Sequence, residues 1–252
     1  MIFFFKPKPI VVDAFTPSER IAKDYPISLS NKHTPDWWRS LSPDMPTMPQ
    51  WPKIKISTMK RCQGFIDMYA NSYTLPLWTD INVELDYTGR EPKDGYTCAD
   101  TITKLVGHDS KQWEGFLDPN KFHHYKIMAP WYMRGKDNVS WSYTQSTWSH
   151  GHLLNDVTIL PAQLNFKYAS AINVNAMFHI GPTRRNSIFL EAGLPLVNLV
   201  PISDRKVDLR IHPVTQDEFN KYMYLGKFNG WNKEVQKYRD TPSKKCPFHF
   251  WK

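Results

Sequence analysis

Apolar and polar residues alternate with a period of two along the middle of this chain. In residues 80–87 (DINVELDY) every second side chain is apolar, and residues 171–180 repeat the pattern with His179 on the polar side. This period places alternate side chains on opposite faces of a strand, so both segments are predicted to be antiparallel strands with one wet face. Further strands are predicted at 53–59, 122–135, 138–148, 187–202 and 205–211, with a turn at 87–97.

Helical patterns are fewer. Residues 16–25 (TPSERIAKDY) are predicted to form a short helix, with Thr16 as the N-cap and Pro17 in the first turn. Helical periodicity returns after Pro213, where Thr215 and Glu218 have the spacing of a capping box. Helix is therefore expected chiefly in the last forty residues.

Short strands separated by turn signals at intervals of roughly ten residues are typical of all-β sandwiches and barrels. The 20 prolines favour the same class, because proline interrupts helices and central strands. The predicted fold is mainly β: an antiparallel, jelly-roll-like β-sandwich over residues 53–212. An extended Pro/Trp-rich N-terminal arm (1–52) and a short, helical, basic C-terminal tail (213–252) are expected to flank it.

Composition and charge narrow the functional classes. An aromatic content of 14% argues against a disordered chain, and the net charge of +8 is concentrated near the C-terminus. Residues 227–252 hold seven Lys or Arg against two acidic residues. A nucleic-acid-binding protein usually gathers its cations on a folded face, so this distribution favours a tail that promotes solubility or docks on an acidic neighbour.

Three well-separated cysteines make a disulfide framework unexpected and favour a reducing compartment. The N-terminal residues lack the pattern of a signal peptide, and no apolar run reaches the ~18 residues of a membrane span. A cytoplasmic location, without secretion or a membrane span, is expected. The chain contains no Walker loop, GxGxxG, nucleophile elbow or HExxH motif.

One segment raises the question of a metal site. Residues 148–156 (WSHGHLLND) contain a His-x-His pair followed by an acidic residue, as in cupins and β-barrel oxygenases. On a strand, His150, His152 and Asp156 would share one face, and His179 from another strand would complete a site for Fe(II), Mn(II) or Zn(II). Gly151 and other turn-forming residues would remove that common face. The segment is therefore predicted to lie at a strand end or in a loop without tight metal binding, and no cofactor is predicted.

Three other candidates have simpler interpretations. His123 and His124 are adjacent on a strand and point to opposite faces, so one is expected to be buried and one exposed. Cys62 has basic neighbours but no identifiable base, which favours a structural role. The arginines of residues 181–186 (GPTRRN) would suit a phosphate or carboxylate, although a solvated loop explains them equally simply.

The flanking segments carry aromatic and basic residues suited to interfaces. The arm holds Trp37, Trp38 and Trp51, whose burial must come either from the sandwich or from a partner. The tail repeats this combination with Lys244, Lys245, Phe248 and Trp251. Deleting residues 1–50 or 241–252 is expected to abolish partner capture while the sandwich stays folded.

Two blocks carry a resemblance to a known group. They are residues 51–85, with Arg61–Cys62 followed by the polar alternation, and residues 125–207, with a Pro-Trp…Arg strand. The second block closes on Gly193, Pro195, Pro201 and Arg205. Over about residues 51–207 the chain resembles a family of uncharacterised proteins from bacteria and tailed phages, particularly marine cyanophages. The resemblance implies a β-sandwich and a phage origin but no activity, and the family lacks the His150-x-His152 pair.

Three functions follow from these observations. The favoured hypothesis is a phage-encoded β-sandwich protein that binds a protein partner or itself, as a virion component or a host-directed accessory factor. The alternative is a cupin-like, non-haem, metal-dependent oxygenase that uses His150, His152, Asp156 and His179 with Fe(II) or Mn(II). Nucleic-acid binding through the tail and exposed aromatic residues ranks third.

Overall fold

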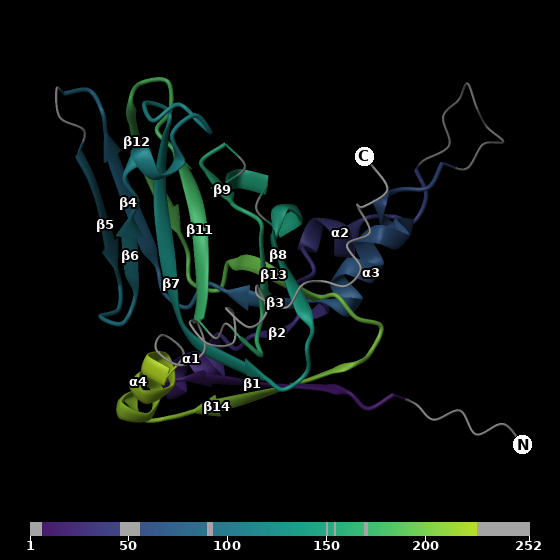
Figure 1. The fold of residues 1–252 in the computed structure, drawn as a ribbon. Coiled ribbons are helices and arrows are strands. Elements are labelled where there is room, and N and C mark those ends of the chain that lie inside the picture. The colour runs from purple at the N-terminus through teal and green to yellow at the C-terminus, as the bar shows by residue number, and fades with distance from the viewer. Residues whose placement is uncertain are drawn as a thin grey trace, which may run out of the picture.

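Two large sheets pack face to face around one hydrophobic core, and a smaller sheet closes one side (Figure 1). The computed structural model describes residues 7–45, 56–89, 93–149, 151–153, 155–168 and 171–225, with the backbone alone for His152 and residues 222–225. The fold is mainly β and sandwich-like, as the alternating pattern predicts. The jelly-roll connectivity stays a prediction.

The six-stranded sheet is built around the long strand β7. Its order is β14 (Val207–Pro213), β1 (Ile10–Thr16), β7 (Phe122–Gly135), β11 (Ala171–His179) and β9 (Val157–Ile159), with β6 (Lys104–Gly107) also paired to β7. Strands β1 and β14 run parallel, and the other pairs are antiparallel.

The other two sheets are antiparallel throughout. The five-stranded sheet has the order β10 (Ala162–Asn165), β8 (Ser140–Gln145), β13 (Pro195–Pro201), β3 (Tyr73–Pro76) and β2 (Ser28–Leu29). The three-stranded sheet consists of β12 (Arg185–Leu190), β4 (Ile81–Asp86) and β5 (Lys93–Cys98).

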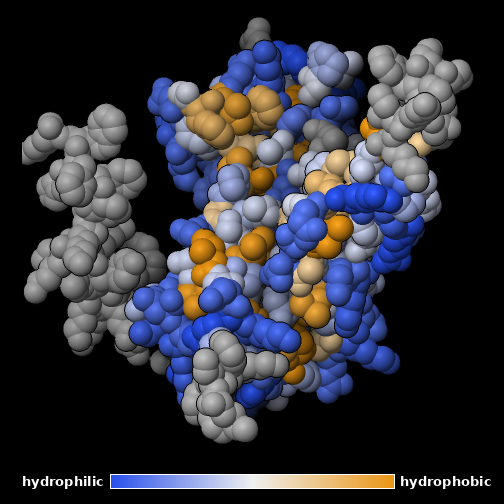
Figure 2. Space-filling view, turned by 90° about the vertical axis from the view of Figure 1, so that its right-hand side faces the viewer, coloured by the Kyte–Doolittle hydropathy of each residue, from blue (hydrophilic) through white to orange (hydrophobic). Residues whose placement is uncertain are grey.

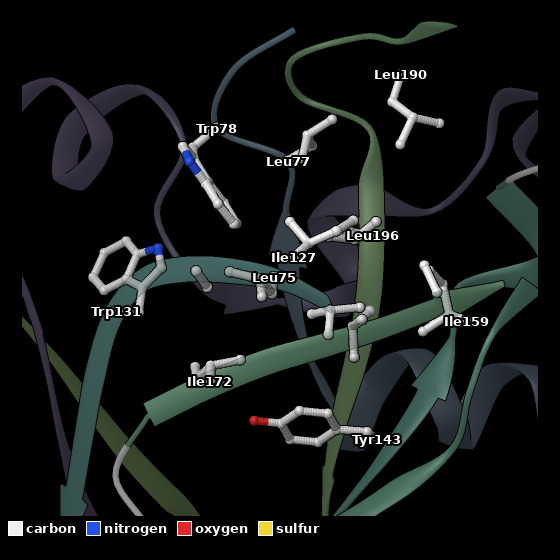
Figure 3. Packing of buried hydrophobic residues seen from close by; sticks show 14 of the residues in the cluster. Leu75, Leu77, Trp78, Ile127, Trp131, Tyr143, Ile159, Ile172, Leu190 and Leu196 are labelled. Carbon is white, nitrogen blue, oxygen red and sulfur yellow. The ribbon is translucent and has the colours of Figure 1, made fainter. Parts of the chain in front are cut away.

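Side chains from the two larger sheets meet in the core. Figure 3 shows Ile127 and Trp131 of β7, Ile172 of β11, Leu75 of β3 and Tyr143 of β8 within this one buried cluster. The predicted alternation is confirmed in β4, where Ile81, Val83 and Leu85 are buried while the residues between them are not. It is confirmed equally in β11, whose inward positions are at most 1% exposed.

Four α-helices and several 3-10 turns connect these strands in the described residues. The helices are α1 (Glu19–Asp24), α2 (Asp36–Ser40), α3 (Gln63–Asn71) and α4 (Gln216–Leu225). The 3-10 turns are η1 (Ser30–His33), η2 (Met59–Arg61), η3 (Ser110–Trp113), η4 (Thr147–Ser149) and η5 (Gly151–Leu153). No helix in the described part of the chain is long and apolar enough to cross a membrane.

The helix predictions were right at two places and wrong at others. At α4, the predicted capping box is present: the Thr215 hydroxyl accepts from the Glu218 amide at 3.3 Å, and Glu218 Oε2 accepts from the Thr215 amide at 3.0 Å. Helix α1 also forms, but its N-cap is Ser18, whose hydroxyl accepts from Ile21, while Thr16 is a buried residue at the end of β1. Within the described residues, helix is not chiefly C-terminal, because α2 and α3 lie in the first third of the chain.

Helix α3 lies between the predicted strands 53–59 and 80–87, in a segment for which the sequence predicted no element. Phe65 and Tyr69, four residues apart, are its buried side chains, so the helix is held by packing of one face. In the predicted strand 53–59, Ser57 makes a single bridge to Asp44 and η2 begins at Met59; residues 53–55 lie outside the described residues. The predicted turn at 87–97 ends earlier, because β5 begins at Lys93 and pairs with β4.

The N-terminal segment differs from an arm laid over the surface. Strand β1 lies inside the six-stranded sheet between β14 and β7, and its alternate residues Ile10, Val12 and Ala14 are at most 1% exposed. Deleting residues 1–50 would therefore remove a central strand and open the sheet. The prediction that a deletion abolishes partner capture while the sandwich stays folded can therefore be tested only by deleting residues 241–252.

The closing motif of the sequence resemblance has a structural explanation. Gly193 has φ +90, a conformation that favours glycine, and its amide donates to the carbonyl of Leu77 at 2.7 Å. This turn leads into β13, which begins at Pro195 and ends at Pro201. Arg205 then donates to the carbonyls of Lys8 and Pro9 at 2.8 and 3.3 Å. The motif thus fastens the start of β1 to the sandwich.

Candidate functional site

The His-x-His segment lies in turns and precedes a strand. Residues 147–149 and 151–153 form η4 and η5, and β9 begins at Val157, so the predicted loop placement is confirmed. Residues 151–153 form a 3-10 turn, so the strand alternation on which the metal hypothesis relied does not hold over these residues. His150 lies outside the described residues, and His152 is described only by its backbone.

The other two candidate ligands are neighbours. The His179 amide donates to the Asp156 carbonyl at 2.8 Å, and Asn186 Nδ2 donates to Asp156 Oδ1 and to the His179 carbonyl at 3.3 and 2.7 Å. His179 Nε2 lies 3.1 Å from the Thr158 hydroxyl. Within the described residues, no three His, Cys, Asp or Glu side chains are gathered to hold a metal ion. The metal question stays a prediction, which elemental analysis of the full chain would test.

The two described tryptophans of the predicted arm lie in a cluster with three other aromatic residues. Trp38 stacks on Phe65 with ring centroids 5.0 Å apart, and Phe65 stacks on Tyr69 at 4.6 Å. Trp37 and Trp148 contact Phe65 at 6.0 and 5.6 Å and each other at 6.0 Å. We call these five residues the aromatic cluster. It joins α2, α3 and η4, which are far apart in the sequence.

Hydrogen bonds fix the position of both α2 indoles. Trp37 Nε1 donates to the Trp148 carbonyl at 2.9 Å, and Trp38 Nε1 donates to the Met59 carbonyl at 3.0 Å. Lys60 Nζ lies 4.2 Å above the Trp38 ring and donates to the carbonyls of Trp38 and Arg39. Because polar and stacking contacts act together, α2 holds its place although it has only five residues.

The aromatic cluster has buried inner rings and exposed outer rings. Phe65 and Tyr69 are each 3% exposed, whereas Trp37 and Trp148 are 41% and 42% exposed. The Tyr69 hydroxyl lies 3.3 Å from the Ser149 hydroxyl, and burial raises the pKa of Tyr69. The sequence left open whether the protein or a partner buries these tryptophans. The protein itself half-buries Trp38, whereas Trp37 stays exposed. The protein itself buries the inner rings and leaves the outer ones accessible.

A groove of about 490 Å³ runs beside the two exposed indoles. It is lined by Trp37 and Trp148 with His33, Arg39, Ser149 and Gly151, among others. We call it the aromatic groove. Figure 2 shows the side of the molecule that carries α2 and α3, where hydrophobic side chains form separate patches between hydrophilic ones. The arm tryptophan and the His-x-His segment, treated separately in the sequence, therefore border the same groove.

The charges around the groove are mainly positive. His33 Nε2 lies 2.9 Å from the Ser28 hydroxyl, and burial, then Lys32 and Arg39, lower the pKa of its ring. Arg39 Nη2 donates to the Lys32 carbonyl at 3.3 Å, and Nη1 lies 3.5 Å from Asp36, with both side chains exposed. An exposed ion pair of this kind contributes little to stability, so the remaining guanidinium donors of Arg39 are available to a ligand.

A second cluster of titratable residues joins the three-stranded sheet to β7. Tyr125 donates to Asp94 Oδ2 at 2.5 Å, the Tyr87 hydroxyl lies 2.7 Å from His123 Nδ1, and His123 Nε2 lies 3.5 Å from Asp94 Oδ2. Burial lowers the pKa of His123 against the opposing effect of Asp94. Burial, with Asp94, raises the pKa of Tyr87 to about 12 and that of Tyr125 further. We call these four residues the His123 network, and it fastens β4 and β5 to the main sheet.

The two adjacent histidines depart partly from expectation. They do point to opposite faces, since His123 meets Tyr87 while His124 stacks on His108 at 4.5 Å and lies 3.3 Å from Asn175 Oδ1. Both are half-buried, so the prediction of one buried and one exposed ring is wrong. The loop that follows β6 covers His124, and the three-stranded sheet covers His123.

Two other candidates from the sequence, Cys62 and Arg185, have ordinary structural environments. Cys62 is the half-buried residue that precedes α3. Arg185 is held by Asp86, to which it donates through Nε and Nη2 at 3.0 and 2.8 Å. Trp148 was not singled out from the sequence, although an aromatic residue among the small residues of 146–151 is a usable signal.

The predicted tail interface is not placed by the structure. Trp51, Lys244, Lys245, Phe248 and Trp251 lie outside the described residues, so their role in partner binding stays a prediction. No protein-family model and no curated protein sequence matches this chain, so the resemblance to tailed-phage proteins also stays a prediction.

Proposed function

We propose that the protein acts by binding a protein partner through the aromatic groove, as a phage-encoded virion component or host-directed accessory factor. The observation that carries the binding role is the pair of indoles, Trp37 and Trp148, left about 40% exposed on a fixed support. The phage context rests on the sequence resemblance alone, as does a location in a host cytoplasm or virion.

The exposed indoles have the properties of interface anchors. Tryptophan and arginine dominate the binding energy of protein interfaces, where they fill pockets and exclude water. Here Trp37, Trp148 and Arg39 lie around one groove. Burying the remaining surface of the two rings against a partner would supply the hydrophobic part of the interaction.

Rigidity supports the same function. A side chain that is ordered before binding loses less conformational entropy when the complex forms. The Trp37 indole is fixed by its bond to the Trp148 carbonyl and by the edge contact with Phe65. The groove therefore holds its anchors in place without a partner.

Charge indicates the chemistry of the partner. The protein has a net charge of +8, and Lys32, Arg39 and Lys60 lie near the groove, with Asp36 as the acidic residue beside them. A complementary surface carries acidic residues next to an apolar side chain. An acidic protein segment fits this pattern better than a basic one.

A displayed library of random peptides, selected on the full-length protein, tests the proposal. Enriched peptides should be acidic and contain an apolar or aromatic residue, and their affinity should fall about tenfold or more in Trp37→Ala or Trp148→Ala. Phe189→Ala is the matched control, because Phe189 is 56% exposed on β12 and outside the groove lining. It should leave the affinity unchanged.

Three outcomes would overturn the proposal. They are the absence of selective enrichment, equal loss in all three variants, or preferential capture of single-stranded oligonucleotides with steep salt dependence. The last result would instead favour the nucleic-acid function. Sedimentation of the free protein distinguishes a second copy of the chain from a foreign partner.

A further inference from the structure

A second groove lies where β11 turns into β12, at the upper end of the sandwich in Figure 1. It has a volume of about 560 Å³ and is lined by Lys121, Phe122, Asn155, His179, Pro182 and Arg184, among others. We infer that this groove binds a small anion, namely a phosphate or carboxylate group carried on an apolar body. We call it the Arg184 groove.

The two neighbouring arginines of the turn are in different situations. Arg185 is occupied by Asp86, which accepts from two of its nitrogens at 3.0 and 2.8 Å. No hydrogen bond or ion pair joins the Arg184 side chain to another residue in the described part of the chain. Arg184 therefore presents a guanidinium to the groove, and this group suits two-point recognition of phosphate or carboxylate.

Backbone conformation and hydrogen bonds fix the position from which the Arg184 side chain extends. Its φ is +58, the left-handed region that a residue with a side chain rarely adopts, and its amide donates to the Gly181 carbonyl at 3.2 Å. The Arg184 carbonyl accepts from the Tyr87 amide at 2.7 Å. The turn thus keeps an arginine in a position where glycine or asparagine would be less strained.

The lining also holds a second cation, Lys121, and one carboxylate, Asp118. Lys121 is 74% exposed and lies 4.0 Å from the nearer oxygen of Asp118, so this ion pair is weak. Asp118 is the carboxylate of the lining, and its Oδ1 accepts from the Asn120 amide and Nδ2 at 2.9 and 3.2 Å. These bonds, led by the amide, lower the pKa of Asp118, so the carboxylate is already occupied within its own turn.

The groove also has an apolar wall. Phe122 meets the His179 ring edge-on with centroids 4.8 Å apart, and Pro182 is a further apolar residue of the lining. The His179 ring is held in turn by Thr158, 3.1 Å from Nε2. A ligand with one anionic group and a flat apolar body would match both parts, with its charge at Arg184 and Lys121.

Titration of the full-length protein with inorganic phosphate and, separately, benzoate tests this inference. Binding is followed by nuclear magnetic resonance of the Gly181 and Arg184 amides at constant low ionic strength, because chloride screens exposed cations. Saturable shifts with either probe are expected, and the tighter probe identifies the anionic group. The partner proposed for the aromatic groove plays no part in this measurement.

Arg184→Gly is the most informative variant. Glycine accepts φ +58 without strain, so this change should preserve or slightly raise the melting temperature while removing the cation. The affinity for the preferred probe should fall roughly tenfold, the value of one charge-assisted hydrogen bond. Lys121→Gln should reduce it in the same direction.

Arg185→Gln is the matched control, since it removes an equal charge from the adjacent residue, whose guanidinium is held by Asp86. Its affinity should stay within about twofold of the wild type. Unsaturated shifts with both probes would overturn the inference. Equal losses in Arg184→Gly and Arg185→Gln would also overturn it, because they would indicate a general charge effect.

Discussion

Two sets of tryptophans in this protein have opposite environments. Trp78, Trp131 and Trp141 come from the sandwich and are at most 1% exposed, whereas Trp37 and Trp148 come from a short helix and a 3-10 turn and are about 40% exposed. Both sets are held by neighbouring residues. The difference lies in whether the surrounding structure closes over the ring.

The contrast follows from the elements that carry each set. Trp131 and Trp141 lie on β7 and β8, and a strand in a sandwich presents alternate residues to the opposing sheet, so the fold itself buries them. Trp78 lies in the buried connection between β3 and β4. A five-residue helix covers only one face, and α2 uses that face for Trp38 while Trp37 lies at its edge. Trp37 and Trp148 are thus packed against the protein on one side and accessible to a ligand on the other, which is the geometry of a binding site.

The largest expected difference between the sets is in stability. Trp78→Ala and Trp131→Ala should each lower the free energy of unfolding by about 3–5 kcal/mol, because each removes a fully buried ring and leaves a cavity. Trp78 also loses its bond to the Thr103 hydroxyl, at 2.7 Å, so it should be at the upper end. Denaturant titration measures both values. A cost near 1 kcal/mol would show that these rings are not part of the core.

The same contrast explains what the sequence could predict. Strands such as β4 and β11 were predictable because burial of one face requires an apolar residue at every second position. The order of apolar and polar residues in the sequence shows this period directly. Helix α3 was not, because its two buried residues, Phe65 and Tyr69, are too few to establish a helical period. The aromatic groove depends on contacts between residues more than 100 positions apart, such as Trp37 and Trp148, and no local pattern records them.

A smaller effect is expected at the junction of the N-terminal strand with the body. Arg205 donates to Asp137 Oδ1 at 2.7 Å and to the carbonyls of Lys8 and Pro9, with both charged side chains under 30% exposed. Arg205→Gln should cost about 1–3 kcal/mol, since it leaves partly buried acceptors unpaired.

The matched control for this prediction is Arg210→Gln. Arg210 pairs with Asp208 at 2.7 Å on the exposed edge strand β14, so its removal should cost about 0.5 kcal/mol or less. Equal costs for the two variants would mean that β1 is held by its sheet bonds alone and that the closing motif is not a fastener.

The His123 network predicts that the stability of the sandwich depends on pH. Burial lowers the pKa of His123 below its usual value of 6.5, so the unfolded chain takes up the proton first. Stability should therefore be complete above about pH 6.5 and decrease as the pH falls through the window below it. Burial gives His33 and His124 contributions of the same sign.

Unfolding measured across this pH range in His123→Gln should show a shallower slope than the wild type. Tyr87→Phe removes the hydroxyl 2.7 Å from His123 Nδ1 without removing the titrating ring, so it should lower stability and keep a slope. A His123→Gln profile parallel to that of the wild type would exclude this network as the source.

Only a small effect on stability is expected where the largest effect on binding is proposed. Trp37→Ala and Trp148→Ala should each cost about 1 kcal/mol or a little more, because nearly half of each ring already faces water and little new cavity forms. Trp38→Ala should cost more than either, since that ring stacks on Phe65, carries Lys60 above it and donates to Met59. Differential melting of the three variants gives the order directly. If Trp37→Ala proved as costly as Trp131→Ala, Trp37 would be a structural residue and its exposure would carry no argument for a partner.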